Sequence, residues 1–174
     1  KAFVYHSAQL IGNVRIERHV FVGPVAVIRA DEPNARGKVQ SIVIKPQSNV
    51  QDGVILHALG GSRISIGPNT SVAHGAVVHG PCKIGSNCFI GFRVVVFDAI
   101  LGDSVYLGAG AIVQNVRLQT CALVPPGSVI VSQKDADQLG RVGPRERRFM
   151  ETVVRTNIEL TKGYSRLKAS MKGG

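Results

Sequence analysis

Three of the five histidines lie in one stretch of the chain, at positions 57, 74 and 79. The imidazole ring binds metal ions through a nitrogen atom and exchanges protons near neutral pH. A catalytic zinc ion commonly takes three protein ligands and keeps a fourth position open for water or substrate. Three imidazoles that converge on one point could form such a site. Whether His57, His74 and His79 converge depends on the elements that carry them.

A six-residue period runs through most of the chain. A helix needs a period of about 3.6 residues and an ordinary strand a period of about 2, so neither explains this spacing. Short strands and turns stacked as a parallel solenoid do explain it. The branched aliphatic residues that carry the period, with slips of one residue near Leu101 and Leu118, are Leu10, Ile16, Val22, Ile28, Ile44, Val50, Leu56, Ile66, Val72, Val78, Ile84, Ile90, Val96, Leu101, Leu107, Val113, Leu118, Val124 and Ile130.

Hexapeptide repeats of this kind resemble the left-handed parallel β-helix, a triangular prism in which three hexapeptides complete one coil; the handedness rests on that resemblance. Residues 33–41 and 59–63 interrupt the period and are expected to be loops outside the prism. We therefore expect an all-β solenoid over residues 1–133 and a C-terminal helical segment packed on the prism over residues 134–174. Its helix should begin at Pro144, with an apolar stripe formed by Phe149, Val153, Leu160, Tyr164 and Leu167.

The composition suits a repetitive core of small and branched aliphatic residues. Hydrophobic residues make up 44% of the chain and aromatic residues only 5%, with 20 glycines. No run of about 18 apolar residues occurs, so we expect no membrane span. The three cysteines form no CxxC motif and are interpreted as buried thiols. Because the chain begins at Lys1 without Met, the sequence is compatible with the removal of a targeting segment that preceded Lys1.

The formal net charge of +10 raises nucleic acid as a possible partner. The basic excess lies largely in the C-terminal quarter, in the segments RVGPRERRF and RLKASMKGG, with no interleaved aromatic residues and no nucleic-acid motif. We expect no nucleic-acid partner and interpret this surface as a solvated basic face, available to an acidic protein partner.

Counting repeats places the histidines on the faces of the prism. Positions three repeats apart lie in adjacent coils, about 4.8 Å apart as in any sheet. The count stacks His57 on His79 and puts Arg29 in the same column. His74 falls on a different face, in register with Asp52, so one chain cannot easily bring it to the other two histidines.

A threefold assembly of parallel prisms would bring different faces of neighbouring chains together. The column of His57 and His79 in one chain would then face His74 of the next, with Gln51 beside it. Three imidazoles arranged in this way could bind zinc at about 2.0–2.1 Å and leave one position open. The geometry predicts a metal site shared between subunits.

Six segments, in this order, resemble the γ-class carbonic anhydrases, including the archaeal prototype and the N-terminal domain of the carboxysome scaffold protein: IRADE, NVQDGVILHAL, VAHGAVVHGP, FIGFRVVVF, VPPGSVIVSQKDADQL and TNIELTKGY. The resemblance implies a homotrimer of left-handed β-helices in the cytoplasm or the carboxysome lumen. It also implies a lyase that reversibly hydrates carbon dioxide to bicarbonate and a proton by means of a zinc-bound hydroxide. The alternative that it leaves is a weakly active or inactive scaffold domain of the carboxysome type.

The resemblance implies that His57, His74 and His79 are ligands of Zn²⁺, with Fe²⁺ or Co²⁺ as alternatives because imidazole suits several divalent metals. It gives roles to six further residues: an intersubunit ion pair (Arg29 and Asp31), groups that handle the metal-bound water and its proton (Glu32 and Gln51), a supporting carboxylate (Asp52) and a helix residue that reaches the pocket (Asn157).

Two features keep other functions open. The archaeal prototype has a long acidic loop after the first ligand, whereas here ALGGSR follows His57 and contains no acidic residue, so proton export would fall to Glu32 or to buffer. Hexapeptide acyltransferases share the prism and the trimer, but they use one essential histidine as general base and bind a CoA-type donor. The paired columns around three histidines argue against that alternative.

Overall fold

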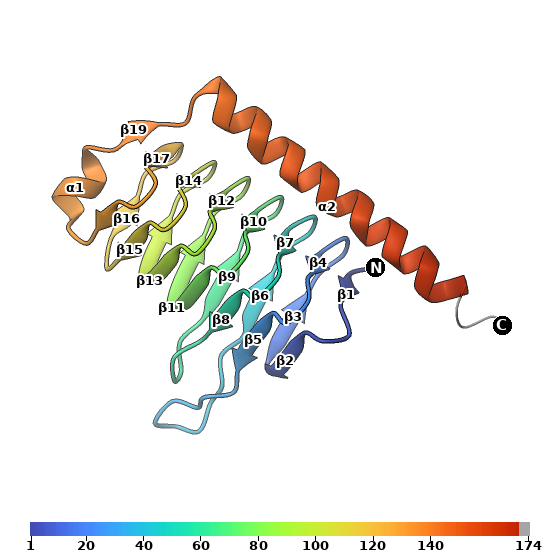
Figure 1. The fold of residues 1–174 in the computed structure, drawn as a ribbon. Coiled ribbons are helices and arrows are strands. Elements are labelled where there is room, and N and C mark those ends of the chain that lie inside the picture. The colour runs from blue at the N-terminus through green and yellow to red at the C-terminus, as the bar shows by residue number, and fades with distance from the viewer. Residues whose placement is uncertain (171–174) are drawn as a thin grey trace.

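The protein is a stack of short β-strand coils along which one long helix returns (Figure 1). The computed structural model describes residues 1–170. Helix α2 (Pro144–Ser170) runs from the last coil back to the first, so the N-terminal strand and the end of the helix are neighbours. A short helix, α1 (Gln133–Asp137), is capped by Ser132 and lies between the last coil and α2.

The strands form the three faces of a prism. One face, which we call the helix face because α2 covers it, consists of β1 (Phe3–Val4), β4 (Phe21–Val22), β7 (Asn49–Val50), β10 (Ser71–Val72), β12 (Phe89–Ile90), β14 (Tyr106–Leu107) and β17 (Ala122–Val124), with β19 (Gly140–Arg141) added antiparallel to β17. The second, the histidine face, consists of β2 (Gln9–Gly12), β5 (Val27–Ala30), β8 (Ile55–His57), the first parts of β11 (Val77–Ile84) and β13 (Val95–Leu101), β15 (Ile112–Gln114) and β18 (Val129–Ile130).

The third face consists of β3 (Val14–Ile16), β6 (Ile42–Ile44), β9 (Ile64–Ile66), the last parts of β11 and β13, and β16 (Arg117–Leu118). Because β11 and β13 each continue round a corner, the histidine face and the third face form a single 11-stranded sheet. All pairings between coils are parallel, and only the β17–β19 pair is antiparallel among the strands of residues 1–170.

The register confirms the repeat predicted from the sequence. Val72 pairs with Ile90, three hexapeptides further on, and Ile84 pairs with Leu101, one residue short of three hexapeptides. The slip near Leu101 is therefore a coil that is one residue shorter. The predicted fold class, a β-helix of hexapeptide repeats with a C-terminal helix, is confirmed.

The core is a stack of inward-pointing aliphatic side chains. Leu56, Ile66 and Val72 have no exposed surface, and small residues such as Ala76 fill the second inward position of each repeat. Cys82 and Cys88 are buried as predicted, whereas Cys121 is only partly buried. Burial raises the pKa of Cys82 to about 11 and that of Cys88 to about 12, so both thiols stay protonated at neutral pH.

Helix α2 begins at Pro144 as predicted, but the side that packs on the prism is not the predicted apolar stripe. The residues that it buries most deeply against the prism are Met150, Asn157 and Thr161. Two members of the predicted stripe, Phe149 and Leu160, remain about 40% exposed. These two residues border a groove between α2 and the prism instead of filling the contact. No helix within residues 1–170 is long and apolar enough to span a membrane.

The two interruptions of the repeat lie side by side and project from one corner of the prism (Figure 1). The backbone N–H of Gly61 in the second loop donates to the carbonyl oxygen of Glu32, just before the first loop, at 3.3 Å. Residues 59–63 therefore pack against the chain that follows β5.

We expect the coil spacing to make Gly67 intolerant of a side chain. A Cβ atom at Gly67 would lie 2.5 Å from the backbone carbonyl of Gly85 in the next coil. We expect Gly67→Ala to lower the free energy of unfolding by about 1–3 kcal/mol, because a well-packed contact would have to shift. Gly163→Ala, on the exposed part of α2 with open space around it, should instead raise it by about 1 kcal/mol. Urea unfolding followed by circular dichroism measures both, and equal stability of the two variants would contradict the tight coil contact.

Candidate metal centre

The histidine face brings His57 and His79 together, as the repeat count predicted. His57 pairs in register with His79 on one side and with Arg29 on the other. The two imidazole rings are 4.8 Å apart between centroids, and His57 Nδ1 lies 3.1 Å from His79 Nε2. Strand stacking alone thus brings the two imidazole rings into contact.

The surroundings of His79 determine which of its nitrogens carries a proton. His79 Nδ1 lies 3.2 Å from the carbonyl oxygen of Gly80, which can only accept a hydrogen bond. Nδ1 therefore carries the proton in the neutral ring, and Nε2 keeps its lone pair toward His57. The edge-on ring of Phe97, 5.2 Å away, packs against the same imidazole.

His57 faces a carboxylate through a nitrogen that has no hydrogen bond. If His79 Nε2 accepts, His57 Nδ1 donates, and the remaining nitrogen of a neutral His57 ring, Nε2, carries a lone pair. This Nε2 is buried, lies 3.0 Å from Glu32 Oε1, and forms no hydrogen bond. Two lone pairs at this distance repel each other, and a positive charge at this point, either a proton on His57 or a cation, would remove the repulsion.

The loop at residues 59–63 holds Glu32. The backbone N–H of Gly60 donates to Glu32 Oε2 at 2.9 Å, which leaves Oε1 directed at His57. Arg29 lies 3.7 Å from the same Oε1 and forms a closer ion pair with Asp31, at 2.7 Å. In the single chain Arg29 and Asp31 thus pair with each other, and an ion pair between subunits stays a prediction. Counting repeats could not predict the Gly60 contact, because it joins two segments that lie outside the regular period.

The third histidine lies at the corner between the helix face and the histidine face. His74 Nδ1 is 3.6 Å from Asp52 Oδ2, longer than a hydrogen bond but close enough for attraction if the ring is charged. The His74 ring stacks nearly parallel on Phe92, with centroids 5.7 Å apart. Both His74 and Asp52 are about half exposed, so they are open to a ligand or to another chain.

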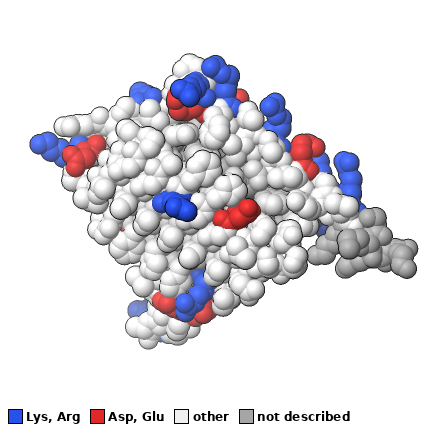
Figure 2. Space-filling view, in the orientation of Figure 1, with Lys and Arg blue, Asp and Glu red and all other residues white. Residues whose placement is uncertain are grey.

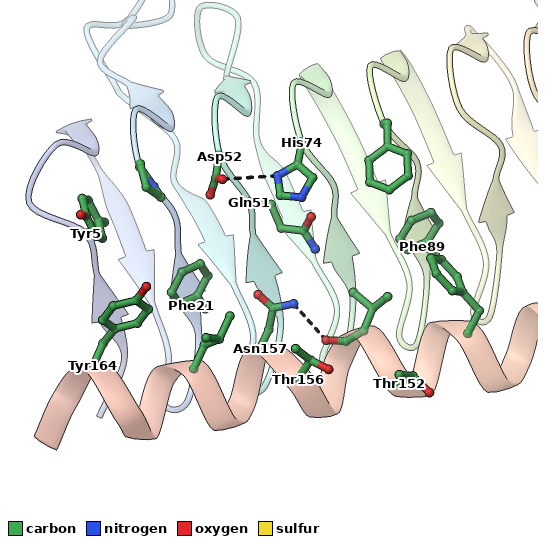
Figure 3. Close-up of a pocket in the computed structure, with 15 residues that line it drawn as sticks. Tyr5, Phe21, Gln51, Asp52, His74, Phe89, Thr152, Thr156, Asn157 and Tyr164 are labelled. Atoms are coloured by element: carbon green, nitrogen blue, oxygen red, sulfur yellow. Dashed lines mark hydrogen bonds and ion pairs between the residues drawn. The ribbon is translucent and has the colours of Figure 1, made fainter. Parts of the chain in front are cut away.

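A row of hydrogen-bonded polar side chains lies beside the groove at His74, and Gln51 of this row lines the groove (Figure 3). Gln51 donates to Asn49 Oδ1 at 2.9 Å, and Asn49 donates to the hydroxyl of Ser71 at 2.8 Å. Asn157 faces them from α2 and donates to the carbonyl oxygen of Val153. Sequence reasoning missed Asn49, although its place two residues before Gln51 directs both side chains to the same side of the strand.

The groove itself has a volume of about 500 Å³ between α2 and the helix face. Aromatic residues form both ends of it, and the polar residues Gln51, Asp52, His74 and Asn157 lie between them (Figure 3). A cavity of this size can take a small ligand or a surface of another chain.

One chain carries two separate parts of the predicted site. Arg29, Asp31, Glu32, His57 and His79 gather on the histidine face, and Gln51, Asp52, His74 and Asn157 gather at the groove. Within residues 1–170, no three His, Cys, Asp or Glu side chains of a single chain are arranged to hold a metal ion. This separation agrees with the repeat count, which put His74 on a different face.

Comparisons with known proteins agree with the fold. Residues 63–97 match the family described as bacterial transferase hexapeptide (six repeats). A hexapeptide transferase family protein from Anaplasma phagocytophilum has a similar structure, with a TM-score of 0.62 and 22% sequence identity over 94% of this chain and 92% of that chain. At this identity the likeness concerns the fold alone.

Two kinds of relative resemble nearly the whole chain. The carboxysome assembly protein CcmM of a Nostoc species is 35% identical over 94% of this chain, and the chain spans only 30% of that protein's length. A carbonic anhydrase of Methanosarcina thermophila is 34% identical over 94% of this chain and 72% of its own length. The chain therefore belongs to the γ-class carbonic anhydrase family.

Proposed function

We propose that this protein catalyses the reversible hydration of carbon dioxide to bicarbonate and a proton, at metal sites between the subunits of a homotrimer. The observation that carries the proposal is the division of the site: His57 and His79 lie on one face and His74 at the edge of another. Each chain of a cyclic trimer would contribute one part to each of two sites. The relationship to a carbonic anhydrase supports the chemistry.

The residues present fit a divalent cation such as Zn²⁺, Fe²⁺ or Co²⁺. His79 keeps a lone pair on Nε2, and the buried Nε2 of His57 has no hydrogen-bond partner and lies against a carboxylate oxygen. Both features favour a positive charge at this point. His57 and His79, with His74 of a neighbouring subunit, would hold the ion.

Exposed apolar side chains on the relevant faces support the trimer. The outward column beside the histidines includes Ile55, Ile112 and Val129, which are between 36% and 57% exposed in the single chain. On α2, Phe149 and Leu160 are exposed at the border of the groove. Contiguous apolar surface of this kind commonly marks a protein–protein interface. A neighbouring subunit in the groove would cover both sets.

The side chains around the candidate site would have different roles in the reaction. A bound divalent metal supplies Lewis acidity that yields a nucleophile from water at neutral pH. Hydration of carbon dioxide forms one C–O bond and releases one proton, so the site needs a base. Glu32 is suited to this role because the Gly60 N–H holds one of its oxygens and leaves the other at the histidines.

On the other side of the site, the row of amide side chains would orient a bound molecule. Asn49 Oδ1 accepts a hydrogen bond from Gln51 Nε2. This bond fixes the Gln51 side chain and leaves its Oε1 free to accept a hydrogen bond. Asn157 presents a second amide from α2. These groups would bind and orient water or bicarbonate at the groove.

A scaffold domain with little or no activity is the second candidate function. The carboxysome assembly proteins are as similar to this chain as the carbonic anhydrase is. The loop after His57 is short and has no acidic residue to carry protons away. In this case the same trimer would form and bind metal, but it would serve assembly.

Stopped-flow hydration of carbon dioxide by metal-quantified protein tests the proposal. We expect turnover at about one metal ion per chain, lost on chelation and in His74→Ala, because each site needs one histidine from a neighbour. His6→Ala, at a histidine outside both parts of the site, is the control and should keep its activity. Metal binding without hydration in strong buffer would contradict the enzyme and support the scaffold domain.

Mixed trimers test the shared site directly. His57→Ala and His74→Ala should each be inactive alone, but refolding them together in equal amounts should restore about a quarter of the wild-type activity, since that share of interfaces combines two intact parts. The measurement is hydration rate per chain after mixing. No recovery in assembled, metal-loaded trimers would show that the histidines do not act across an interface.

Glu32→Gln tests the proton acceptor. We expect hydration in weak buffer to fall by about 10²-fold, the low end of the usual contribution of a general base, and imidazole buffer to restore part of it. Glu17→Gln, which removes an exposed carboxylate from another part of the prism, should leave the rate unchanged. If Glu32→Gln matches the wild type at every buffer concentration, Glu32 is not the acceptor.

A further inference from the structure

Helix α2 carries a stripe of basic side chains on its exposed side, consisting of Arg148, Arg155, Lys162 and Arg166. Successive members are seven or four residues apart, so they lie on one side of the helix, with seven residues spanning about 10 Å. Basic side chains are visible along the edge that α2 forms, with a few acidic ones among them (Figure 2). We call these four residues the basic stripe.

Most of the basic stripe lies away from the surfaces that the proposed trimer would use, and Arg155 alone among the four lines a hollow with Leu160 and Tyr164, which also line the groove. The groove beside His74 is lined on its helix side by residues such as Phe149, Val153 and Leu160, and by no member of the stripe. A neighbouring subunit that filled the groove would leave Arg148, Lys162 and Arg166 exposed. The charge of the stripe is therefore available to a different partner.

Few acidic groups neutralise the stripe within the described part of the chain. Lys162 forms a 2.8 Å ion pair with Glu159, and the hydrogen bond from Lys162 lowers the pKa of that carboxyl. Arg148 and Arg155 have no ion pair among residues 1–170. Two guanidinium groups, each suited to bidentate contact with a carboxylate, thus remain free.

An apolar hollow lies next to the stripe, on the side of α2 opposite the groove. It has a volume of about 390 Å³, and Met150, Val154 and Ile158 contribute apolar surface to it. Arg155 of the basic stripe also lines it, together with Glu151. A ligand that contacts the stripe could therefore place an apolar side chain in this hollow.

We propose that the basic stripe and the adjacent hollow bind an acidic segment of another protein that carries an apolar side chain. The inference goes beyond carbon dioxide hydration, since it concerns a surface outside the site. A protein segment fits better than nucleic acid, because the carboxylates of Glu151 and Glu159 beside the stripe would repel a continuous phosphate backbone. A peptide can place single carboxylates at Arg148 and Arg155 and avoid these positions.

Two variants of equal net charge test the docking surface. In the first, Arg148, Arg155, Lys162 and Arg166 are all replaced by Gln. The matched control replaces four exposed basic residues that α2 does not carry, Arg15, Lys45, Lys83 and Arg117, by Gln. The probes are a synthetic glutamate-rich peptide with regularly spaced leucines, the same peptide with alanine for leucine, a single-stranded oligonucleotide, and vesicles of phosphatidylcholine and phosphatidylserine.

Fluorescence anisotropy at low salt should show binding of the leucine peptide that weakens by at least about tenfold in the α2 variant and by less than about twofold in the control. The alanine peptide should bind the unmodified protein more weakly than the leucine peptide. Equal losses in both variants would reduce the effect to net charge and overturn the proposal. So would α2-dependent binding that is stronger for the oligonucleotide or the vesicles.

Both variants should keep the hydration rate of the unmodified protein, because none of their residues lies at the candidate metal centre. Loss of peptide binding with unchanged hydration, or loss of hydration with unchanged peptide binding, would show that the docking surface and the proposed catalytic site act separately.

Discussion

The parallel stacking of coils, one strand spacing apart, is the constraint on which the rest of the structure depends. Inward aliphatic residues fix the register, because a shift by one residue would turn the buried side chains outward. Each outward residue is then held above its counterpart in the next coil, as His57 is above Arg29 and below His79. The same rigidity keeps His74 at another edge of the prism. A solenoid can thus build columns of functional groups with accuracy, but it cannot bend two of its faces toward each other.

The buried polar side chains outside the core differ in whether their hydrogen bonds are complete. Asn49 and Gln51 are buried and hydrogen-bonded in a row, which is the usual condition for polar groups away from water. His57 departs from this rule, because its buried Nε2 faces the Glu32 oxygen without a hydrogen bond. An unsatisfied buried polar atom costs about 1–3 kcal/mol, so a structure keeps one where a ligand or proton compensates for it. The contrast between the two neighbouring polar sets makes the histidine pair a point where a proton or a bound ion would compensate for the missing hydrogen bond.

The sequence predicted the parts of the structure that follow from its period. The stacking of His57 on His79 and the position of His74 on another face came from counting repeats, because register in a parallel solenoid depends only on residue spacing. The rotation of α2 was predicted less well. Phe149 and Leu160 formed the more hydrophobic stripe, but Asn157 is buried instead and donates to the carbonyl oxygen of Val153 on the same helix, while the two apolar side chains lie at the groove. The packing of α2 on the prism joins distant elements and leaves no periodic signal in the sequence.

The division of the site links activity to assembly. A concave pocket needs walls on several sides, and the prism faces of one chain are close to flat, so the second wall comes from another chain or from helix α2. Here α2 supplies one wall with Asn157, and the exposed apolar column at Ile55 and Ile112 supplies a surface suited to a neighbour. In the proposed trimer, catalysis and scaffolding would require the same interface. In the proposed trimer, an ion shared between chains would stabilise the assembly by its binding free energy, even where a short loop after His57 slowed turnover.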